Sequence, residues 1–391
     1  MKTLDLSNSS ISMNGSKGSV INATTFAALD FLEELDVSNN HNLPFTNLTD
    51  PNLFNYLTSL KILKMYGTTH VLNATGGYPN KLWSNVPKLE EIWIDGLPFG
   101  VSGEEFKGMP NLKNIRISGD LIDPLWLAHK YCHIEHISNE MLTNLEHVSN
   151  LSIVHSNVHS ISELAFNGVK NLNVLDLWCN LELGFGNASR GFGHLNSGLK
   201  MLALNNIERR YYVIINESFA RSLHNTSLTN LYIESNNIFR FDENAFINLP
   251  ISLKKLYARN NRFDLDYYLT RMKDLTNLEL LDLSLNKLTF FNNDTNHEFC
   301  SSGLTEIPRK GNSRLFTNEI KNAAFRIAGC INEVQIEIPA VLPPKLETLD
   351  VHSSNIGIAV YGYMSKNNSL KTVYASNSLL NSWPNPFPYI P

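Results

Sequence analysis

The chain has 391 residues, of which 43% are hydrophobic and 18% charged, so it is long enough to bury a substantial core. Its net charge of -5 at pH 7 provides no general attraction to nucleic acid or to an anionic membrane. The four cysteines are widely spaced and include no C-x-x-C pair, which excludes a dense disulfide scaffold. No apolar run reaches the ~18 residues that a bilayer crossing requires, and the first residues lack the apolar stretch of a signal peptide.

One apolar pattern, L-x-x-L-x-L-x-x-N-x-L, recurs along nearly the whole chain. Clear copies begin at Leu172, Leu228, Leu253 and Leu278. Looser copies, several with Thr, Asp or Ser in place of Asn, begin at Leu32, Leu60, Leu89, Leu112, Val148, Leu199, Ile331, Leu346 and Leu370. Most neighbouring copies start 23 to 29 residues apart, which is the spacing of the leucine-rich repeat.

The pattern predicts an α/β solenoid, a leucine-rich-repeat horseshoe with a concave parallel β-sheet and an irregular or short helical convex side. In x-L-x-L-x the apolar residues point inward from a short strand, and the following Asn can bond backbone groups that the turn leaves unpaired. We expect Phe26, Phe166 and Phe246 to fill the convex side of the core. A leucine-rich helical protein would instead show a period of 3.6 residues and better helix formers than Asn, Ser and Thr.

We expect residues 1–391 to form a single solenoid of about 13–14 repeats. Two stretches break the rhythm: an irregular stretch at 121–147 and an insertion at about 292–330. The chain begins on a repeat strand and stops in a return segment, without the paired cysteines of a cap. Because a solenoid needs polar caps at its ends, we expect a piece of a longer protein.

The cysteines leave two interpretations open. Cys300 and Cys330 bracket the insertion, and we predict a disulfide between them that closes it. Free buried thiols are the alternative, because spacing does not determine pairing. Cys179 could reach Cys132 only if the intervening repeats are compact.

Two further motifs suggest chemistry. On a helix, the spacing of His129, Cys132, His133 and His136 would place four zinc ligands on one face. A His-rich loop is the simpler interpretation, because structural zinc usually takes ligand pairs from two segments, so we expect no metal and no cofactor. The glycine-rich run 184–193 lacks a following Gly-Lys-Ser/Thr, and we expect a flexible loop there. No nucleophile elbow or H-E-x-x-H motif occurs, so we expect no enzyme.

N-x-S/T glycosylation acceptors are spread along the chain. They are Asn8, Asn14, Asn22, Asn47, Asn73, Asn150, Asn187, Asn216, Asn225, Asn293 and Asn367. This is a modest excess over the roughly seven expected by chance. None coincides with the expected interior positions, which are Asn40, Asn180, Asn236, Asn261 and Asn286. A glycan could not fit at those positions, so the placement favours an extracellular or lumenal compartment.

The side chains between and just after the inward-pointing ones should form the concave surface. Among them, aromatic and charged residues of the kinds that dominate binding energetics are our candidate ligand-binding residues. They are Trp93, Arg116, Trp178, Tyr232, Glu234, Tyr257 and Arg259. The same rule places on this face Lys64, Tyr66, Asp95, Asp176, Asp282, Asp350, His352 and Tyr374. The alternative is that aromatic residues simply suit a pleated surface.

The repeats resemble those of animal extracellular leucine-rich-repeat proteins, as in the segments 165–168 (Ala-Phe-Asn-Gly) and 244–246 (Asn-Ala-Phe). The segment 342–351, in which a Pro-Pro turn leads into the next strand, is similar to segments of Toll-like receptor ectodomains. Irregular repeat lengths, long insertions and many acceptors add to that resemblance. It implies an innate-immune receptor that binds a protein or microbial ligand, dimerises, and signals through a part that this chain lacks.

Two other functions are compatible with the same repeats. One is a secreted or adhesive leucine-rich-repeat protein of the matrix or of cell contacts, and the other is an intracellular scaffold. A signal peptide, a membrane helix and a signalling domain in the full reading frame would identify the receptor, and a signal peptide alone the secreted protein. The charge balance argues against a nucleic-acid partner. Attachment to a membrane would require a segment outside this chain.

Overall fold

The computed structural model describes residues 1–11, 21–41, 43, 52–68, 85–96, 103–118, 132–242, 244–263, 267–286, 325–328, 335–338, 342–354 and 369–374. They fall in two compact units, Met1–Glu208 and Arg209–Pro391, and each is considered by itself. The predicted Cys300–Cys330 disulfide and most of the insertion lie outside the described residues. So do five glycosylation acceptors: Asn14, Asn47, Asn73, Asn293 and Asn367.

In the first unit, short strands pair in parallel, each with the strand of the next repeat. They are β1 (Thr3–Asp5), β2 (Glu34–Asp36), β3 (Ile62–Lys64), β4 (Glu91–Ile94), β5 (Asn114–Ser118), β7 (Asn150–Val154), β9 (Val174–Asp176) and β10 (Met201–Ala203). A separate parallel pair joins β6 (His136–Ile137) and β8 (Ser160–Ile161). One strand per repeat, stacked in parallel, is the predicted leucine-rich-repeat arrangement, which is therefore confirmed.

The second unit repeats this plan. Its main parallel strands are β12 (Asn230–Tyr232), β14 (Lys255–Tyr257), β15 (Leu280–Asp282), β18 (Thr348–Asp350) and β19 (Thr372–Tyr374). Two smaller pairs accompany them: β11 (Val213–Ile215) runs parallel to β13 (Ile238–Phe241), and β16 (Phe325–Ala328) antiparallel to β17 (Gln335–Ile338).

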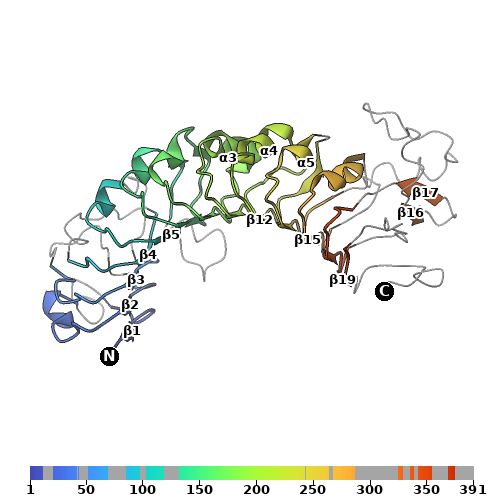
Figure 1. Cartoon of the computed structure of the whole chain (residues 1–391). Helices are drawn as coiled ribbons and strands as arrows, with labels where there is room; N and C mark the ends of the chain where they lie inside the picture. Colours follow the sequence, from blue (N-terminus) through green and yellow to red (C-terminus); the bar gives the residue numbers. More distant parts are fainter. Residues whose placement is uncertain are drawn as a thin grey trace. The chain divides into compact units, whose positions relative to one another are not determined.

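Short helices form the side of each unit that faces away from the main strands (Figure 1). In the first unit they are η1 (Ala23–Phe26), η4 (Gly103–Phe106), η5 (Glu140–Leu142), η6 (Ala165–Gly168) and α3 (Gly184–Phe192). In the second unit they are α4 (Glu217–Leu223), α5 (Ala245–Asn248) and η7 (Tyr267–Asp274). Phe26, Phe166 and Phe246 are at most 2% exposed beneath this layer, which confirms their predicted role in the core.

A ladder of asparagine side chains lines the inner corner of the coils. Asn261 Oδ1 accepts hydrogen bonds from the backbone N–H groups of Asn236 and Ile238, at 2.9 and 3.1 Å. Its Nδ2 donates to the carbonyls of Ile233 and Ala258, at 3.0 and 2.9 Å. Matching hydrogen bonds are made by Asn40, Asn180 and Asn286. One buried amide thus satisfies backbone groups of two successive coils, as the repeat pattern predicts.

The residue just before each ladder position has a left-handed backbone. Asn39, Cys179, Asn260 and Leu285 have φ values between 53° and 62°. Asparagine and glycine adopt this conformation more readily than other residues, and Gly67 with φ 65° holds the same place before Thr68. The bulkier Leu285 therefore sits in a strained conformation that the turn imposes.

The glycine-rich run is a helix, so the predicted flexible loop is wrong. In α3 the side chains of Phe185, Ala188 and Phe192 are buried, at a spacing that places them on one helical face. A Cβ at Gly191 would lie 2.3 Å from Ile161 Cγ2, so this glycine lets the helix pack closely against β8. Burial of the apolar face outweighs the low helix propensity of glycine here.

Candidate ligand-binding faces

The strand register gives each unit a row of neighbouring side chains on the face opposite the helices. In the first unit one residue from each strand enters this row, in the order Asp5, Asp36, Lys64, Trp93, Arg116, Ser152, Asp176 and Ala203. The centre of the row combines an aromatic ring with basic residues. The structure thus brings together two of the predicted ligand-binding residues, Trp93 and Arg116.

Trp93 is the hub of this face. Lys64 Nζ lies 5.3 Å and Arg116 Cζ 5.0 Å from its ring centroid, which are cation–π distances. The ring of Tyr66 lies 5.8 Å away, centroid to centroid. Trp93 Nε1 donates a 2.6 Å hydrogen bond to Glu91 Oε1, which fixes the plane of the indole. Lys64 Nζ is paired with Glu34 Oε1 at 2.7 Å, so Arg116 and the held ring form the preorganised surface for an anionic or aromatic ligand group.

Arg116 extends the face towards Asp176 and Trp178. Burial raises the pKa of Asp176, against the opposing effects of a hydrogen bond from the Trp178 N–H and of the Arg116 charge. Trp178 is 39% exposed and packs edge-on against His155 at 4.5 Å. Arg116 Nε is buried and makes no hydrogen bond within the described part of the chain. An unused donor beside an aromatic ring is a feature of a site prepared for an acceptor.

The corresponding row of the second unit is aromatic and acidic. It runs Tyr232, Tyr257, Asp282, Asp350 and Tyr374. The rings of Tyr232 and Tyr257 are stacked, with centroids 4.4 Å apart and planes within 3°. Two of the predicted ligand-binding residues thus form one flat aromatic surface.

Glu234 and Arg259 lie beside the tyrosine stack. The pKa of Glu234 is raised by burial and by the nearby charge of Asp282, while Arg259 acts in the opposite direction. Burial also raises the pKa of Tyr257, with contributions from Tyr232 and from the two carboxylates. This face therefore concentrates acidic groups that partly repel one another, which favours a cationic ligand group.

Asp95, expected on the concave surface, is fully buried, and that prediction is wrong. Its carboxylate accepts hydrogen bonds from the backbone N–H groups of Gly67 (2.5 Å) and Thr68 (3.0 Å). Thr68 stands where the repeat pattern has Asn. Because the regular ladder amide is absent at this place, the next coil supplies an acceptor by turning Asp95 inward.

The described glycosylation acceptors differ in how accessible they are. Four are exposed: Asn8, Asn22, Asn216 and Asn225. Asn150 and Asn187 are half-buried, and their Nδ2 atoms donate to Asn114 Oδ1 (2.6 Å) and to the His159 carbonyl (2.9 Å). A glycan at either would displace a structural hydrogen bond, so the exposed four fit modification better. Glycosylation itself stays a prediction.

The His- and Cys-containing segment is extended where it is described, not helical. Cys132 is buried with Sγ 2.5 Å from Ser156 Oγ, whereas His136 is exposed and bonds to serines of β8 and the following turn. His129 lies outside the described residues. Among the residues that the structure describes, no group of three or more potential ligands could hold a metal ion. Cys132 and Cys179 are free buried thiols, and burial raises the pKa of both.

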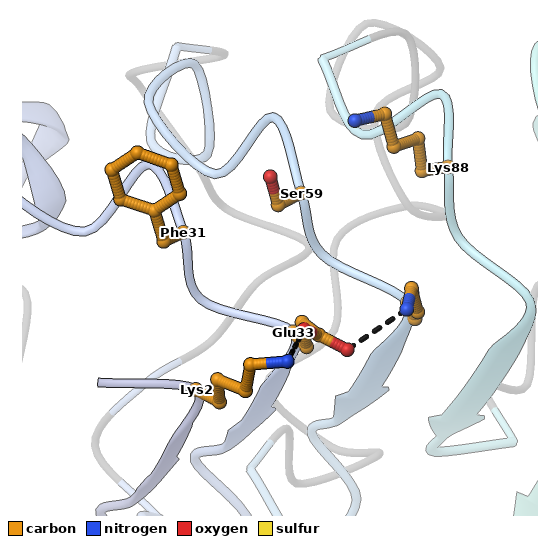
Figure 2. A pocket seen from close by; sticks show the side chains of 6 residues that line it. Lys2, Phe31, Glu33, Ser59 and Lys88 are labelled. Carbon is orange, nitrogen blue, oxygen red and sulfur yellow. Dashed lines mark hydrogen bonds and ion pairs between the residues drawn. The ribbon is translucent and has the colours of Figure 1, made fainter.

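A shallow pocket lies at the edge of the first unit's sheet (Figure 2). Its lining residues are Lys2, Phe31, Glu33, Ser59, Lys61 and Lys88. Glu33 lies between Lys2 and Lys61, at 2.6 and 2.8 Å from their Nζ atoms. Hydrogen bonds from these two lysines lower the pKa of Glu33 to about 2. The pocket's central charges therefore satisfy one another, and the concave rows are stronger candidates for a ligand.

Comparison with known proteins supports the resemblance seen in the repeats. No protein-family model matches the chain. A Toll-like receptor 4 of Pinctada imbricata is 29% identical over 266 residues, which are 66% of this chain and 28% of the receptor. The chain thus spans less than a third of the length of this curated relative. Among the described residues, no helix has the length and apolar character that a bilayer crossing requires.

A solved structure shows the same fold. A crystal structure of TLR13 in complex with a single-stranded RNA aligns with 97% of this chain and 47% of its own, at 15% identity and a TM-score of 0.55. The Toll receptor in the Drosophila Toll–Spatzle complex covers 74% of this chain and 38% of its own, at 16% identity and a TM-score of 0.44. The chain is therefore a leucine-rich-repeat solenoid whose sequence is similar to that of a Toll-like receptor.

Proposed function

We propose that this chain is a ligand-binding part of the ectodomain of an innate-immune leucine-rich-repeat receptor of the Toll-like kind. In this proposal it binds a protein or microbial ligand on the extracellular face of a membrane, and the whole receptor dimerises and signals through another part. Binding, not catalysis, is its role. The sequence similarity to a Toll-like receptor and the leucine-rich-repeat fold support this assignment.

The observation that carries the proposal is the composition of the two concave rows. Trp93 with Arg116, and Tyr232 with Tyr257, expose rings and charges that the fold itself does not need on that face. Aromatic residues and arginine supply most of the free energy of binding at protein interfaces. Aromatic residues alone also suit a pleated sheet surface, so it is their combination with Arg116 in the first unit and with Glu234 and Arg259 in the second that supports a binding role.

Binding of purified microbial products tests the proposal. The full chain would be immobilised and exposed to lipopolysaccharide, lipoteichoic acid, peptidoglycan fragments and a single-stranded RNA. We expect at least one to bind, and we expect Trp93→Ala/Arg116→Ala or Tyr257→Ala/Arg259→Ala to weaken that binding about ten-fold or more. The control is Lys170→Ala/Arg190→Ala, which removes two exposed cations of the first unit.

Unchanged affinity in both concave variants would contradict a concave ligand site. In cells that express the full reading frame, a transcriptional reporter should lose its response in the same variants that lose binding. A scaffold or adhesive protein would give no such reporter signal.

The proposed compartment has a separate test. The chain, secreted from cultured animal cells behind a borrowed signal peptide, should show a mobility shift after glycosidase treatment. We expect Asn→Gln changes at the four exposed acceptors to remove most of that shift. Absence of any shift would remove the argument from glycosylation for an extracellular protein.

A further inference from the structure

A second surface of the second unit combines exposed rings with arginines, away from the concave row. It lies on β11 and β13, the parallel pair that connects the main strands to the helices. We call it the arginine–tyrosine patch and define it by Tyr211, Tyr212, Ile214, Phe239, Arg240 and Arg262. The repeat pattern does not require any of these residues, since the alternating buried positions of the two strands satisfy it.

Four side chains of the patch, those of Arg262, Tyr211, Tyr212 and Phe239, contact one another in a continuous chain. Arg262 Cζ lies 3.6 Å from the centroid of the Tyr211 ring, and Arg262 Nε donates a 3.0 Å hydrogen bond to Asn237 Oδ1. The Tyr211 and Tyr212 rings meet edge to face at 5.3 Å. Tyr212 meets Phe239 in the same way at 5.7 Å. These contacts hold exposed side chains in fixed positions before any partner arrives.

The patch is exposed although the strands beneath it are well packed. Tyr211 is 62%, Tyr212 50% and Ile214 41% exposed. By contrast, Val213 and Phe241 of the same two strands are at most 4% exposed. Large apolar side chains that cluster on a well-packed support are typical of an interaction surface, whereas single exposed apolar residues are common on any protein.

The patch is rich in arginine. The segments 209–214 and 237–241 contain Arg209, Arg210 and Arg240, and Arg262 adds a fourth guanidinium, against the two flanking carboxylates of Glu208 and Asp242. Arginine binds carboxylates through two parallel hydrogen bonds, which lysine cannot do. All four cations are arginines, which favours recognition of planar acidic groups over a general attraction to negative charge.

We propose that the arginine–tyrosine patch binds an acidic segment of a protein partner. Carboxylates of the partner would pair with the guanidinium groups, and its apolar side chains would pack on Ile214 and Phe239. A single-stranded nucleic acid fits the geometry less well. Its bases need open, parallel ring faces, but here the rings meet edge to face and Arg262 covers one face of Tyr211.

This inference goes beyond the proposed function, because the patch shares no residue with the concave rows. The test uses the full chain and a fluorescein-labelled 16-residue peptide of Glu and Asp with interspersed Leu and Phe, followed by fluorescence anisotropy. We expect the peptide to bind, and a Lys-containing peptide of the same length to fail. Arg240→Glu/Arg262→Glu should weaken binding about ten-fold or more.

Two further variants keep the test decisive if that double variant misfolds. Arg209→Glu/Arg210→Glu changes two exposed residues beside the patch and should weaken binding without loss of structure. Tyr212→Ala should weaken it at constant charge. The matched control Lys170→Glu/Arg190→Glu makes the same change of net charge in the first unit and should leave peptide affinity unchanged.

The outcomes separate this proposal from the others. Equal affinity of the wild type and both arginine variants would overturn it. Tighter binding of a dT20 oligonucleotide than of the peptide, lost in the same variants, would assign the patch to nucleic acid instead. Loss of peptide binding in Trp93→Ala/Arg116→Ala but not in the patch variants would overturn the proposal and assign the peptide to the concave row of the first unit, so failure of the concave site and failure of the patch are distinguishable.

Discussion

The two units share one backbone plan and differ in the chemistry at the centre of their rows. In the first unit Trp93 lies between Lys64 and Arg116, so the centre of this row is aromatic and basic, while Asp5, Asp36 and Asp176 stand further along it. In the second unit the Tyr232–Tyr257 stack is followed by carboxylates, so its face is aromatic and acidic. Apart from Ala203, the row positions do not contribute to the apolar core, which leaves them free to differ from repeat to repeat. The architecture thus separates what stabilises the coil from what binds.

The two units also differ in how a neighbouring charge affects the ionisation of a carboxyl group. The charge of Arg116 favours ionised Asp176 in the first unit, against the effect of burial. In the second unit Asp282 disfavours ionised Glu234 and adds to the effect of burial. A neighbouring charge therefore moves the pKa downward in one unit and upward in the other.

The largest effect is expected from the feature that both units share. Asn180→Ala in the first unit removes the side-chain partner of two N–H groups and two carbonyls of the coil. Asn261→Ala in the second unit does the same for two N–H groups and the Ile233 carbonyl, while the Ala258 carbonyl keeps its hydrogen bond from Asn286 Nδ2. We expect each to destabilise its own unit by about 3 kcal/mol or more. Hydrogen exchange of the backbone amides would show the loss of protection, and would show whether it stays within the mutated unit.

The control for the ladder is Asn225→Ala, at an exposed position, which should change stability by less than about 0.5 kcal/mol. Ser156→Ala, at a ladder position without the amide, should have an intermediate effect, because Ser156 Oγ donates a 2.8 Å hydrogen bond to the Val154 carbonyl and accepts one from the Cys132 thiol. Equal effects of all three types of variant would contradict the ladder as the main polar support of the coil.

The next effect concerns the tyrosine stack of the second unit. Parallel rings at 4.4 Å should contribute about 1 kcal/mol beyond the area they bury. A double-mutant cycle with Tyr232→Leu and Tyr257→Leu measures this coupling through denaturant unfolding. Leucine retains apolar area, so the cycle measures the ring–ring contact together with the hydroxyl interaction of the two tyrosines. Additive single effects would show that the rings are merely neighbours.

The pKa contrast between the units can be measured directly. Arg116→Gln should raise the pKa of Asp176 further, because it removes the charge that favours the carboxylate. Asp282→Asn should lower the pKa of Glu234, because it removes a repelling charge. Carboxyl carbon NMR titrations of the two variants report both shifts. Shifts of the same sign would contradict the contrast.

The sign of the pH dependence follows from these directions. Asp176 and Glu234 both have raised pKa values in the folded chain, so at these two groups the folded state binds more protons than the unfolded state. Their contribution to stability should therefore fall as the pH rises above their ordinary pKa values of 3.8 and 4.5. Asp176→Asn should stabilise the first unit at pH 7 and lose that advantage below pH 3.8, which thermal unfolding at both pH values would show.

How far the sequence predicts each part depends on whether a residue obeys the repeat. The ladder residue Asn261 and the core residue Phe166 follow from the pattern, because every coil repeats the same unpaired groups and the same gap. The position of Asp95 does not follow from the pattern, because the inward direction of its side chain depends on Thr68 in the preceding coil. The prediction of a flexible loop at 184–193 was wrong because it gave weight to the glycines and not to the helical spacing of the apolar residues between them.

The binding residues are predicted in part. Register follows from the repeat, so Trp93 and Arg116 could be placed side by side before the structure was known. The arginine–tyrosine patch could not, because β11 and β13 lie outside the consensus and their pairing includes a register shift after Val213. The run Arg209-Arg210-Tyr211-Tyr212 was the available signal, and only the structure shows Arg262 packed on it.

The smallest effect is expected at the edge of each sheet that the amino ends of the strands form, where lysines and glutamates of successive coils alternate. The first unit pairs Glu33 with Lys2 and Lys61, and the second pairs Lys254 with Glu279. These side chains are largely solvated, and exposed ion pairs contribute little to stability. We therefore expect Glu33→Gln and Glu279→Gln to change the melting temperature by less than about 2 °C, and 1 M NaCl to erase the difference from the wild type. A salt-resistant loss of several degrees in one unit alone would show that its edge is structural. The contrast between the units would then extend from the binding rows to the scaffold.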